Sequence, residues 1–234
     1  MRVAAVADLH APTNLNLFKE ALLKLGGCDL FLLAGDIVLK GDHTQLPGVV
    51  AAIREVYNEQ VLACFGNEEY EQEVGKLKEF REITWLDDQA VTVEVGGLKV
   101  GVVGTRGSLD RPTFWQRANI RGIWETYRKR VETIDRLLGE LQTDVKIVVS
   151  HYSPTYLTLE GERETAMPEM ASQKMEDVIK KRQPDVWFHG HIHKGKKLDV
   201  EIGRTLVVNS SLPARGKIAV AELPKRTGIE KFIG

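Results

Sequence analysis

The sequence predicts a layered α/β protein in which short buried parallel strands alternate with helices. From residue 3 to residue 65, apolar runs of strand length alternate with stretches of helical periodicity. Such alternation is typical of a parallel sheet covered by helices. With 234 residues, 43% of them hydrophobic, the chain is long enough to bury a sizeable core. Because no internal repeat or linker interrupts the pattern, we expect one domain over residues 1–234.

The first half of the chain supplies three predicted strands and two predicted helices. The strands are apolar runs at residues 3–7, 29–34 and 61–65. The first helix spans residues 14–25, where apolar side chains recur at helical spacing until Gly26 and Gly27 end it. The second spans residues 47–56, and its Pro47 is tolerated because it lies in the first turn.

The second half begins with a β-hairpin signal, because alternating residues flank Gly96-Gly97. Further strands are predicted at residues 91–95, 98–103, 145–149, 186–188, 198–202, 205–208 and 218–223. Two further helices are predicted at residues 127–141 and 168–181. Residues 105–124, rich in arginine and aromatic residues, are predicted to form a loop.

Composition narrows the classes of partner. The formal net charge of −1 offers no general attraction for nucleic acid or an anionic membrane, so we expect neither as a partner. No apolar run approaches the length of a membrane span and no signal peptide precedes the first strand, so a cytoplasmic protein is expected. Cys28 and Cys64 lie in apolar surroundings without C-x-x-C spacing, which predicts buried free thiols. Most of the four tryptophans are expected in the core.

Polar residues gather where the predicted strands end. They are Asp8, His10, Asp36, Asn67, His151, His191 and His193. A capping or surface role is a reasonable explanation for any one of them, and the preferred one for Asn67 alone. However, ligands of open α/β sheets bind at the carboxyl ends of strands, where all seven fall. The set exceeds the four groups of one tetrahedral ion and suits two ions that share a carboxylate. Nitrogen and oxygen ligands favour manganese, iron, zinc, cobalt or nickel over calcium, without selecting among them.

These residues carry a family resemblance. Asp8-x-His10, Gly35-Asp36, Gly66-Asn67, His151 and Gly190-His191-x-His193 resemble, in order and flanking glycines, the motifs of the calcineurin-like metallophosphoesterases. The resemblance implies a four-layer αββα sandwich with two mixed sheets flanked by helices. It also implies that Asp8, His10 and His193 hold one metal, that Asn67, His151 and His191 hold the other, and that Asp36 bridges them. A metal-bridging hydroxide is then the expected nucleophile.

One position departs from the family pattern. The family usually has Gly-Asn-His followed by an acid, and that histidine assists the leaving group, whereas this chain has Glu68 and then Glu69. An exposed glutamate is ionised at neutral pH and cannot donate a proton, although burial or a neighbouring carboxylate changes this. We favour an ionised bystander, because such a doublet usually faces solvent. Asn67, Glu68 and His151 are the candidate catalytic residues.

The 105–124 loop contains a cluster of arginines beside aromatic residues, namely Arg106, Arg111, Arg117 and Arg121 with Phe114 and Trp115. The cluster is either a phosphate-binding element or a solvated loop packed by its aromatics. Arg106 is nearest to a strand end and is the candidate substrate-binding residue. Of the remaining histidines, His43 is expected at the surface, and His189 is a candidate orienting partner for the metal ligands.

The predicted function is hydrolysis of phosphomonoesters or phosphodiesters by an enzyme with two divalent metal ions. We expect a small phosphate ester as the substrate. Two alternatives remain open: a nuclease of the same family, and a catalytically weak scaffold or binding protein that retains the fold.

Overall fold

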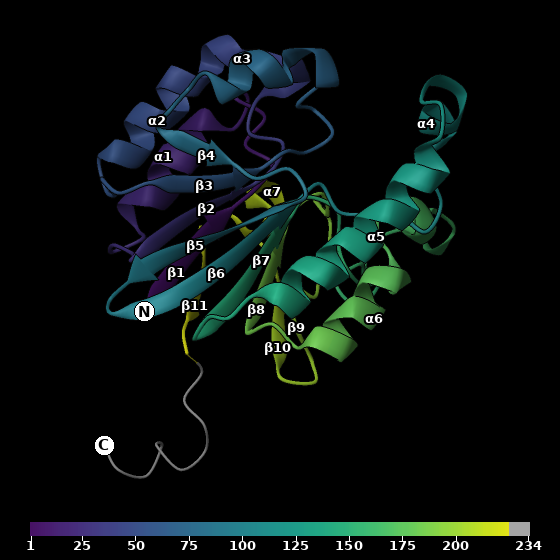
Figure 1. Ribbon diagram of the computed structural model, residues 1–234. Helices are drawn as coiled ribbons and strands as arrows, with labels where there is room; N and C mark the ends of the chain where they lie inside the picture. Colours follow the sequence, from purple (N-terminus) through teal and green to yellow (C-terminus); the bar gives the residue numbers. More distant parts are fainter. Residues whose placement is uncertain (225–234) are drawn as a thin grey trace.

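The computed structural model describes residues 1–224 and contains two mixed β-sheets flanked by helices (Figure 1). The first and last described strands are neighbours, although they are more than 200 residues apart in sequence. The last part of the predicted domain, residues 225–234, lies outside the described residues.

The first sheet has five strands in the order β11-β1-β2-β3-β4. Their bounds are β11 (Ala219–Glu222), β1 (Arg2–Val6), β2 (Leu30–Ala34), β3 (Val61–Cys64) and β4 (Ile83–Trp85). All neighbours are parallel except β1 and β11. Its outer face packs against α1 (Leu15–Leu23), α2 (Leu46–Arg54) and α3 (Val74–Lys78).

The second sheet has six strands in the order β5-β6-β7-β8-β10-β9. Their bounds are β5 (Gln89–Val95), β6 (Leu98–Thr105), β7 (Val145–Ser150), β8 (Val186–His189), β10 (Thr205–Asn209) and β9 (Asp199–Ile202). The two edge pairs are antiparallel hairpins, and the four central strands run parallel. α5 (Ile123–Glu140) and α6 (Gln173–Arg182) cover its outer face. The predicted αββα sandwich is confirmed.

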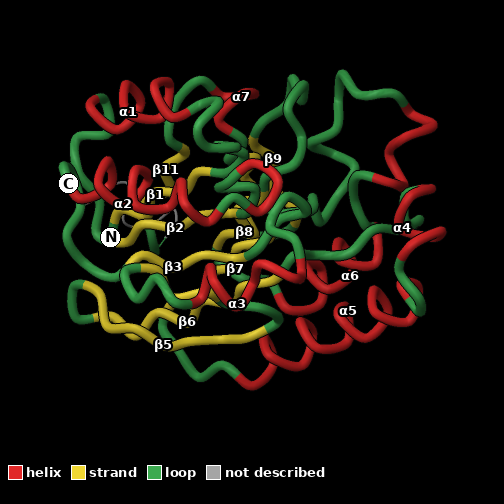
Figure 2. Tube along the Cα trace, turned by 90° about the horizontal axis from the view of Figure 1, so that it is seen from above, coloured by secondary structure: helices red, strands yellow, loops and turns green. Residues whose placement is uncertain are grey.

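Continuous apolar runs form the strands because both faces of each sheet are buried. Along β1, Ala4 and Val6 contact the helix layer, while Val3 and Ala5 belong to the core between the sheets. Figure 2 shows the layers from above: α1 and α2, the first sheet, the second sheet, then α5 and α6. Because the two sheets share one core, their carboxyl edges meet along one seam.

Several short elements were not predicted. They are β4, α3, α4 (Phe114–Asn119), α7 (Leu212–Arg215) and the 3₁₀ helices η1 (Leu39–Gly41), η2 (His43–Gln45), η3 (Glu71–Glu73) and η4 (Glu164–Glu169). The helix expected from residue 168 begins at Gln173, because Pro168 belongs to η4. The expected loop 105–124 is partly helical, and α5 begins within it.

Two expectations about burial were only half right. Trp85 and Trp187 are buried, but Trp115 and Trp124 are exposed, so the placement of most tryptophans in the core was wrong. Cys64 is a buried free thiol as predicted, whereas Cys28 is partly exposed. Within residues 1–224, no helix combines the length and apolar character that a membrane crossing requires.

Candidate metal centre

All seven predicted metal ligands follow the carboxyl ends of parallel strands. Asp8, His10, Asp36 and Asn67 follow β1, β2 and β3 of the first sheet, and His151, His191 and His193 follow β7 and β8 of the second. A hydrogen bond joins the segments that follow β8 and β1 at this point, because the His191 backbone amide donates to Asp8 Oδ2 at 2.9 Å. The candidate site therefore lies on the seam between the sheets.

Ligand atoms converge in two groups. Those of Asp8, His10 and His193 all lie within 4.8 Å of one another, and so do those of Asp8, Asp36 and His151. The first group is the expected ligand set of one ion. Asp8 is common to both groups, while Asp36 Oδ2 lies 3.9 Å from His10 Nε2 and 3.4 Å from His151 Nε2. Asp36 is thus placed between a histidine of each group.

Asn67 and His191 complete the second half of the site. Asn67 Oδ1 lies 3.0 Å from His151 Nε2, and the rings of His151 and His191 are 5.0 Å apart between centroids. His151 Nδ1 is 3.2 Å from the Ala34 carbonyl oxygen, which orients the ring. The structure therefore brings all seven predicted residues together.

The electrostatics leave the buried histidines neutral. Burial lowers the pKa of His151 to about 4 and that of His191 to about 3, although the Asp8 carboxylate partly opposes both shifts. Burial also lowers the pKa of His10. His193 differs, because its hydrogen bond to Asp8 raises its pKa. A neutral imidazole offers the lone pair that a metal ion needs.

The two aspartates respond to different surroundings. Burial raises the pKa of Asp8, but the hydrogen bond from His193 and the neighbouring His151 outweigh this and bring it to about 2. Burial also raises the pKa of Asp36, and here the Glu69 and Asp8 carboxylates add to the rise. Like charges surround Asp36, and a bound cation would offset their repulsion.

The residues therefore fit divalent cations. The donors are imidazole nitrogens and carboxylate or amide oxygens, which suit first-row transition ions. His10 Nδ1 is buried without a hydrogen-bond partner among the described residues. A buried nitrogen with no partner is costly, and a ligand relieves that cost.

The site backbone is unusual at the ligands themselves. Asp8, His10, Asp36 and His191 adopt positive φ angles of 61°, 42°, 52° and 70°. Left-handed conformations of residues other than glycine cost of order 1–3 kcal/mol each and cluster at functional sites. The surrounding contacts must hold these turns in place.

Glu69 supplies much of that support, and sequence analysis misplaced it. It is fully buried, so the expectation that the Glu68-Glu69 doublet faces solvent was wrong for this residue. Its carboxylate accepts four backbone N–H groups, from Asp36 and Gly66 (2.8 and 2.6 Å) and from Ile37 and Val38 (2.7 and 3.1 Å). Glu69 therefore ties the Asp36 turn to the Asn67 turn. The available signal was the acid that the family pattern places at this position.

The same two turns touch at Gly66. A Cβ atom there would lie 2.2 Å from Asp36 Oδ1, so only glycine allows this approach. The Glu68 amide also donates to Asp36 Oδ1 at 2.8 Å. The Glu68 carboxylate is half-buried and accepts the Lys40 amide at 2.8 Å.

Arg106 contacts the Asn67 turn directly. Its Nη1 donates to the Gly66 carbonyl oxygen at 2.6 Å, its guanidinium lies 5.3 Å from the centre of the Phe65 ring, and Nη2 is 3.6 Å from Glu71 Oε2. Arg106 is thus at the site edge, as predicted, and also supports the turn that carries Asn67.

The two remaining histidines differ in how far their side chains are buried. His43 is partly exposed, and its Nδ1 lies 3.3 Å from Glu73 Oε2. His189 is fully buried, and its Nδ1 lies 2.9 Å from the Gly190 carbonyl oxygen. The structure shows no hydrogen bond from His189 to a predicted ligand side chain among the described residues, so its orienting role stays a prediction.

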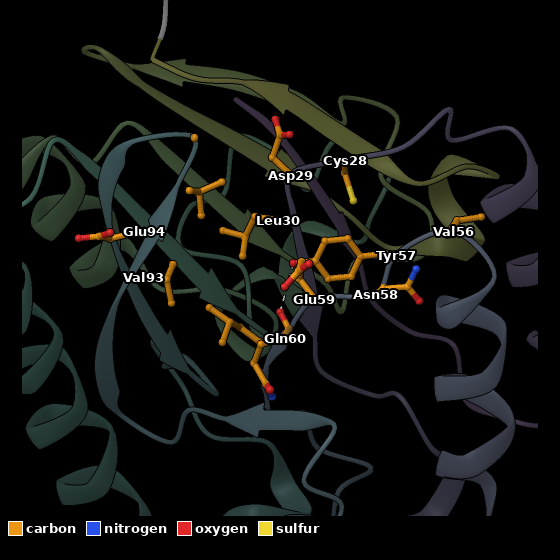
Figure 3. Close-up of a pocket in the computed structure, with 13 residues that line it drawn as sticks. Cys28, Asp29, Leu30, Val56, Tyr57, Asn58, Glu59, Gln60, Val93 and Glu94 are labelled. Atoms are coloured by element: carbon orange, nitrogen blue, oxygen red, sulfur yellow. Dashed lines mark hydrogen bonds between the residues drawn. The ribbon is translucent and has the colours of Figure 1, made fainter.

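A cavity of 550 Å³ lies away from this edge, beside the amino ends of β2 and β3 (Figure 3). Tyr57, Cys28 and Leu30 line it together with the exposed carboxylates of Glu59 and Glu94. None of its lining residues is a predicted metal ligand, so it is separate from the candidate metal centre.

Comparisons with known proteins agree with this geometry. The family model of calcineurin-like phosphoesterases matches residues 1–195. Among curated proteins there is no match to this chain.

Solved structures share the fold at low sequence identity. The phosphopantetheinyl hydrolase PptH from Mycobacterium tuberculosis is 13% identical, with a TM-score of 0.67 and 97% of each chain covered. A hypothetical protein from Thermus thermophilus is 19% identical, with a TM-score of 0.59 over 89% of this chain and 75% of that one. A putative 5'-nucleotidase from Staphylococcus aureus is 17% identical, with a TM-score of 0.57 over 89% of this chain and 48% of that one.

Proposed function

Because the chain belongs to the calcineurin-like phosphoesterase family, whose members hydrolyse phosphoesters with divalent metal ions, we propose that it cleaves phosphomonoesters or phosphodiesters with two such ions. The observation that carries the proposal is the convergence of two ligand groups, Asp8 with His10 and His193, and Asp8 with Asp36 and His151. The two groups share Asp8 and contain five residues, one more than the four ligands of a single tetrahedral ion.

In this proposal each side chain has a holding role. Asp8, His10 and His193 would hold one ion, Asn67, His151 and His191 would hold the other, and Asp36 would serve both. When bound, the ions would supply charge to the phosphoryl oxygens and lower the pKa of a water molecule toward neutrality. The neutral rings of His151 and His191 are ready to bind without first losing a proton.

Substrate contacts come from the turns around the ions. We propose that Arg106 donates from Nη2 to a phosphate oxygen, since Nη2 makes no hydrogen bond within residues 1–224. The Asn67 turn that Arg106 supports then carries both a metal ligand and the edge of the substrate site. Glu68 Oε2 accepts the Lys40 amide, and we propose that this carboxylate positions the Lys40 turn and does not protonate the leaving group.

The test is the Asp36→Asn substitution. Turnover of bis(4-nitrophenyl) phosphate should fall by more than about 100-fold. Replacing a residue that only orients a metal ligand typically lowers metal affinity or activity by about 10–100-fold, and Asp36 is proposed as a ligand itself. Metal content, measured by mass spectrometry after dialysis, should fall with it. Asp177→Asn, at an exposed position of α6, is the matched control and should keep both. A fully active Asp36→Asn enzyme would sink the proposal. Manganese is the first ion to supply, and a DNA substrate in the same assay tests the nuclease alternative.

A further inference from the structure

The segment of residues 113–124, here named the aromatic arm, carries an unusual set of exposed side chains. Phe114 is 77% exposed, Trp115 64% and Trp124 56%, and Ile120 also lies open. Of the large hydrophobic residues that are exposed in residues 1–224, only Leu17, Leu23 and Leu157 lie elsewhere. The arm projects beyond the first turn of α5, with α4 at its tip (Figure 1). Large exposed apolar side chains gathered in one short segment are typical of an interaction site.

The arm is held in place without burying its rings. A capping box begins α4, because Thr113 Oγ1 accepts the Gln116 amide at 3.3 Å and Gln116 Oε1 accepts the Thr113 amide at 2.9 Å. Arg111 at its base bonds to Glu169 at 3.0 Å and to the Thr165 carbonyl oxygen at 2.8 Å. Polar contacts therefore fix the backbone, and the aromatic rings stay free for a ligand.

One tyrosine connects the arm to the metal centre. Gln116 Nε2 donates to the Tyr152 hydroxyl at 3.2 Å, and the Tyr152 ring lies 4.9 Å from the His191 ring between centroids. Tyr152 also follows His151 in the chain and lies 5.4 Å from that ring. Tyr152 therefore contacts the arm, through Gln116, and two of the predicted metal ligands.

The charge of the arm selects the occupant. Residues 111–124 contain three arginines and no carboxylate. Arg111 and Arg117 pair with Glu169, but Arg121 is exposed and has no partner within residues 1–224. Aromatic rings bind planar bases by stacking, and arginine adds a cation for phosphate or for a ring face. The arm of a second copy would bring the same arginines and no carboxylate from residues 111–124, so two arms offer each other no complementary charge.

We propose that the aromatic arm binds the base of a nucleotide phosphoester whose phosphate lies at the metal centre. The proposal rests on the proposed function, because it names the substrate class of that same site. Stacking rings, a free cation and a neighbouring phosphoester site are the three features that a nucleotide satisfies together.

The first experiment compares two esters that share a leaving group. Thymidine 5'-(4-nitrophenyl) phosphate carries a base, and methyl 4-nitrophenyl phosphate does not. In Trp115→Ala and Phe114→Ala, the ratio of kcat/KM for the thymidine ester to that for the methyl ester should fall about 5- to 100-fold, since stacking on a base has that magnitude. Leu23→Ala, an exposed apolar residue of α1, is the control and should keep the ratio. An unchanged ratio in both arm variants overturns the proposal.

The second experiment needs neither metal nor turnover. Thymidine 5'-monophosphate, added in the presence of EDTA, should quench tryptophan emission in the wild type and less in Trp115→Ala. Quenching without hydrolysis of either ester would support the arm and contradict the proposed function. Absence of quenching overturns the arm proposal, and so does an emission shift with phosphatidylglycerol vesicles alone. A dimer in sedimentation that nucleotide does not dissociate also overturns it.

Discussion

At the scale of single residues, we expect protonation of the leaving group to depend on the position after Asn67. Glu68 occupies the position where the family usually has histidine, and its carboxylate accepts the Lys40 amide. We expect Glu68→Gln to keep most of the activity, because the amide oxygen still accepts that bond. Glu68→His should raise the rate on alkyl phosphates by about 10- to 100-fold, since general acid assistance has at least that magnitude.

Leaving-group dependence checks the same point in the unaltered enzyme. Nitrophenolate needs little protonation, so nitrophenyl esters should react much faster than alkyl esters. A rate independent of leaving-group acidity would show that another acid acts. A hundredfold loss in Glu68→Gln, with both metals retained, would identify Glu68 as that acid.

Glu69 is predicted to support the site without touching substrate. In Glu69→Gln, an amide NH₂ replaces one carboxylate oxygen and faces backbone donors, so two N–H groups lose their acceptor. The free energy of unfolding in urea should fall by about 2–5 kcal/mol. Metal affinity, measured by calorimetry, should fall about 10–100-fold.

The control for this change is Glu79→Gln, ten residues on at an exposed position. It should leave both quantities within error of the wild type. Equal stability of Glu69→Gln and wild type would mean that the four backbone contacts contribute nothing to the turns.

At the scale of elements, the close approach of β8 to the first sheet depends on Gly190. A Cβ atom at this position would lie 2.5 Å from Ala7 Cβ and 3.0 Å from the Ala34 carbonyl oxygen. Gly190→Ala should therefore lower the free energy of unfolding by about 1–3 kcal/mol through overpacking. It should also weaken metal binding, because the two sheets contribute different ligands.

Gly75→Ala in α3 provides the comparison, because nothing lies within 4 Å of the added atom. It should leave stability unchanged or raise it by about 0.5–1 kcal/mol. If Gly190→Ala unfolds at the same urea concentration as Gly75→Ala, the seam is looser than its geometry indicates.

Elements with a buried face on regular spacing could be predicted from the sequence. The strands of both sheets and helices α1, α2 and α5 carry apolar side chains where packing requires them. β4 has only three residues, too few to show a period. α4 buries none of its residues, so it has no periodic pattern of buried apolar side chains. The capping box formed by Thr113 and Gln116 is the local sequence signal for this helix.

The convergence of the seven candidate ligands could be predicted because their chemistry and their positions coincide at strand ends. Glu69 could not, since the burial of a carboxylate is decided by tertiary contacts with the Asp36 turn, 33 residues earlier. The exposure of Trp115 and Trp124 also depends on tertiary structure. Tryptophan side chains are usually buried, and only the fold shows that these two remain exposed.

At the scale of the whole molecule, metal binding is expected to hold the two sheets together. We propose that residues 1–234 form one domain, so heating should give one transition. Chelation with EDTA should lower Tm by about 5–10 °C, because ligand at a hundredfold excess over Kd contributes about 2.7 kcal/mol. Scanning calorimetry measures this shift. Asp36→Asn should respond less to EDTA, and an unchanged Tm in the wild type would contradict the coupling.

The pairing of β1 with β11 determines when during synthesis the first sheet can be completed. Residues 2–5 can pair with residues 219–222 only after the latter have been synthesised, so the first sheet gains its edge strand late. Next to this pair, the Met1 amino group donates to the Leu223 carbonyl oxygen at 2.8 Å. Contacts so distant in sequence make folding slow. His191 and His193 also leave the ribosome after the other four strands of the first sheet. A nascent chain therefore carries no complete site, and activity begins only once these late segments have been made.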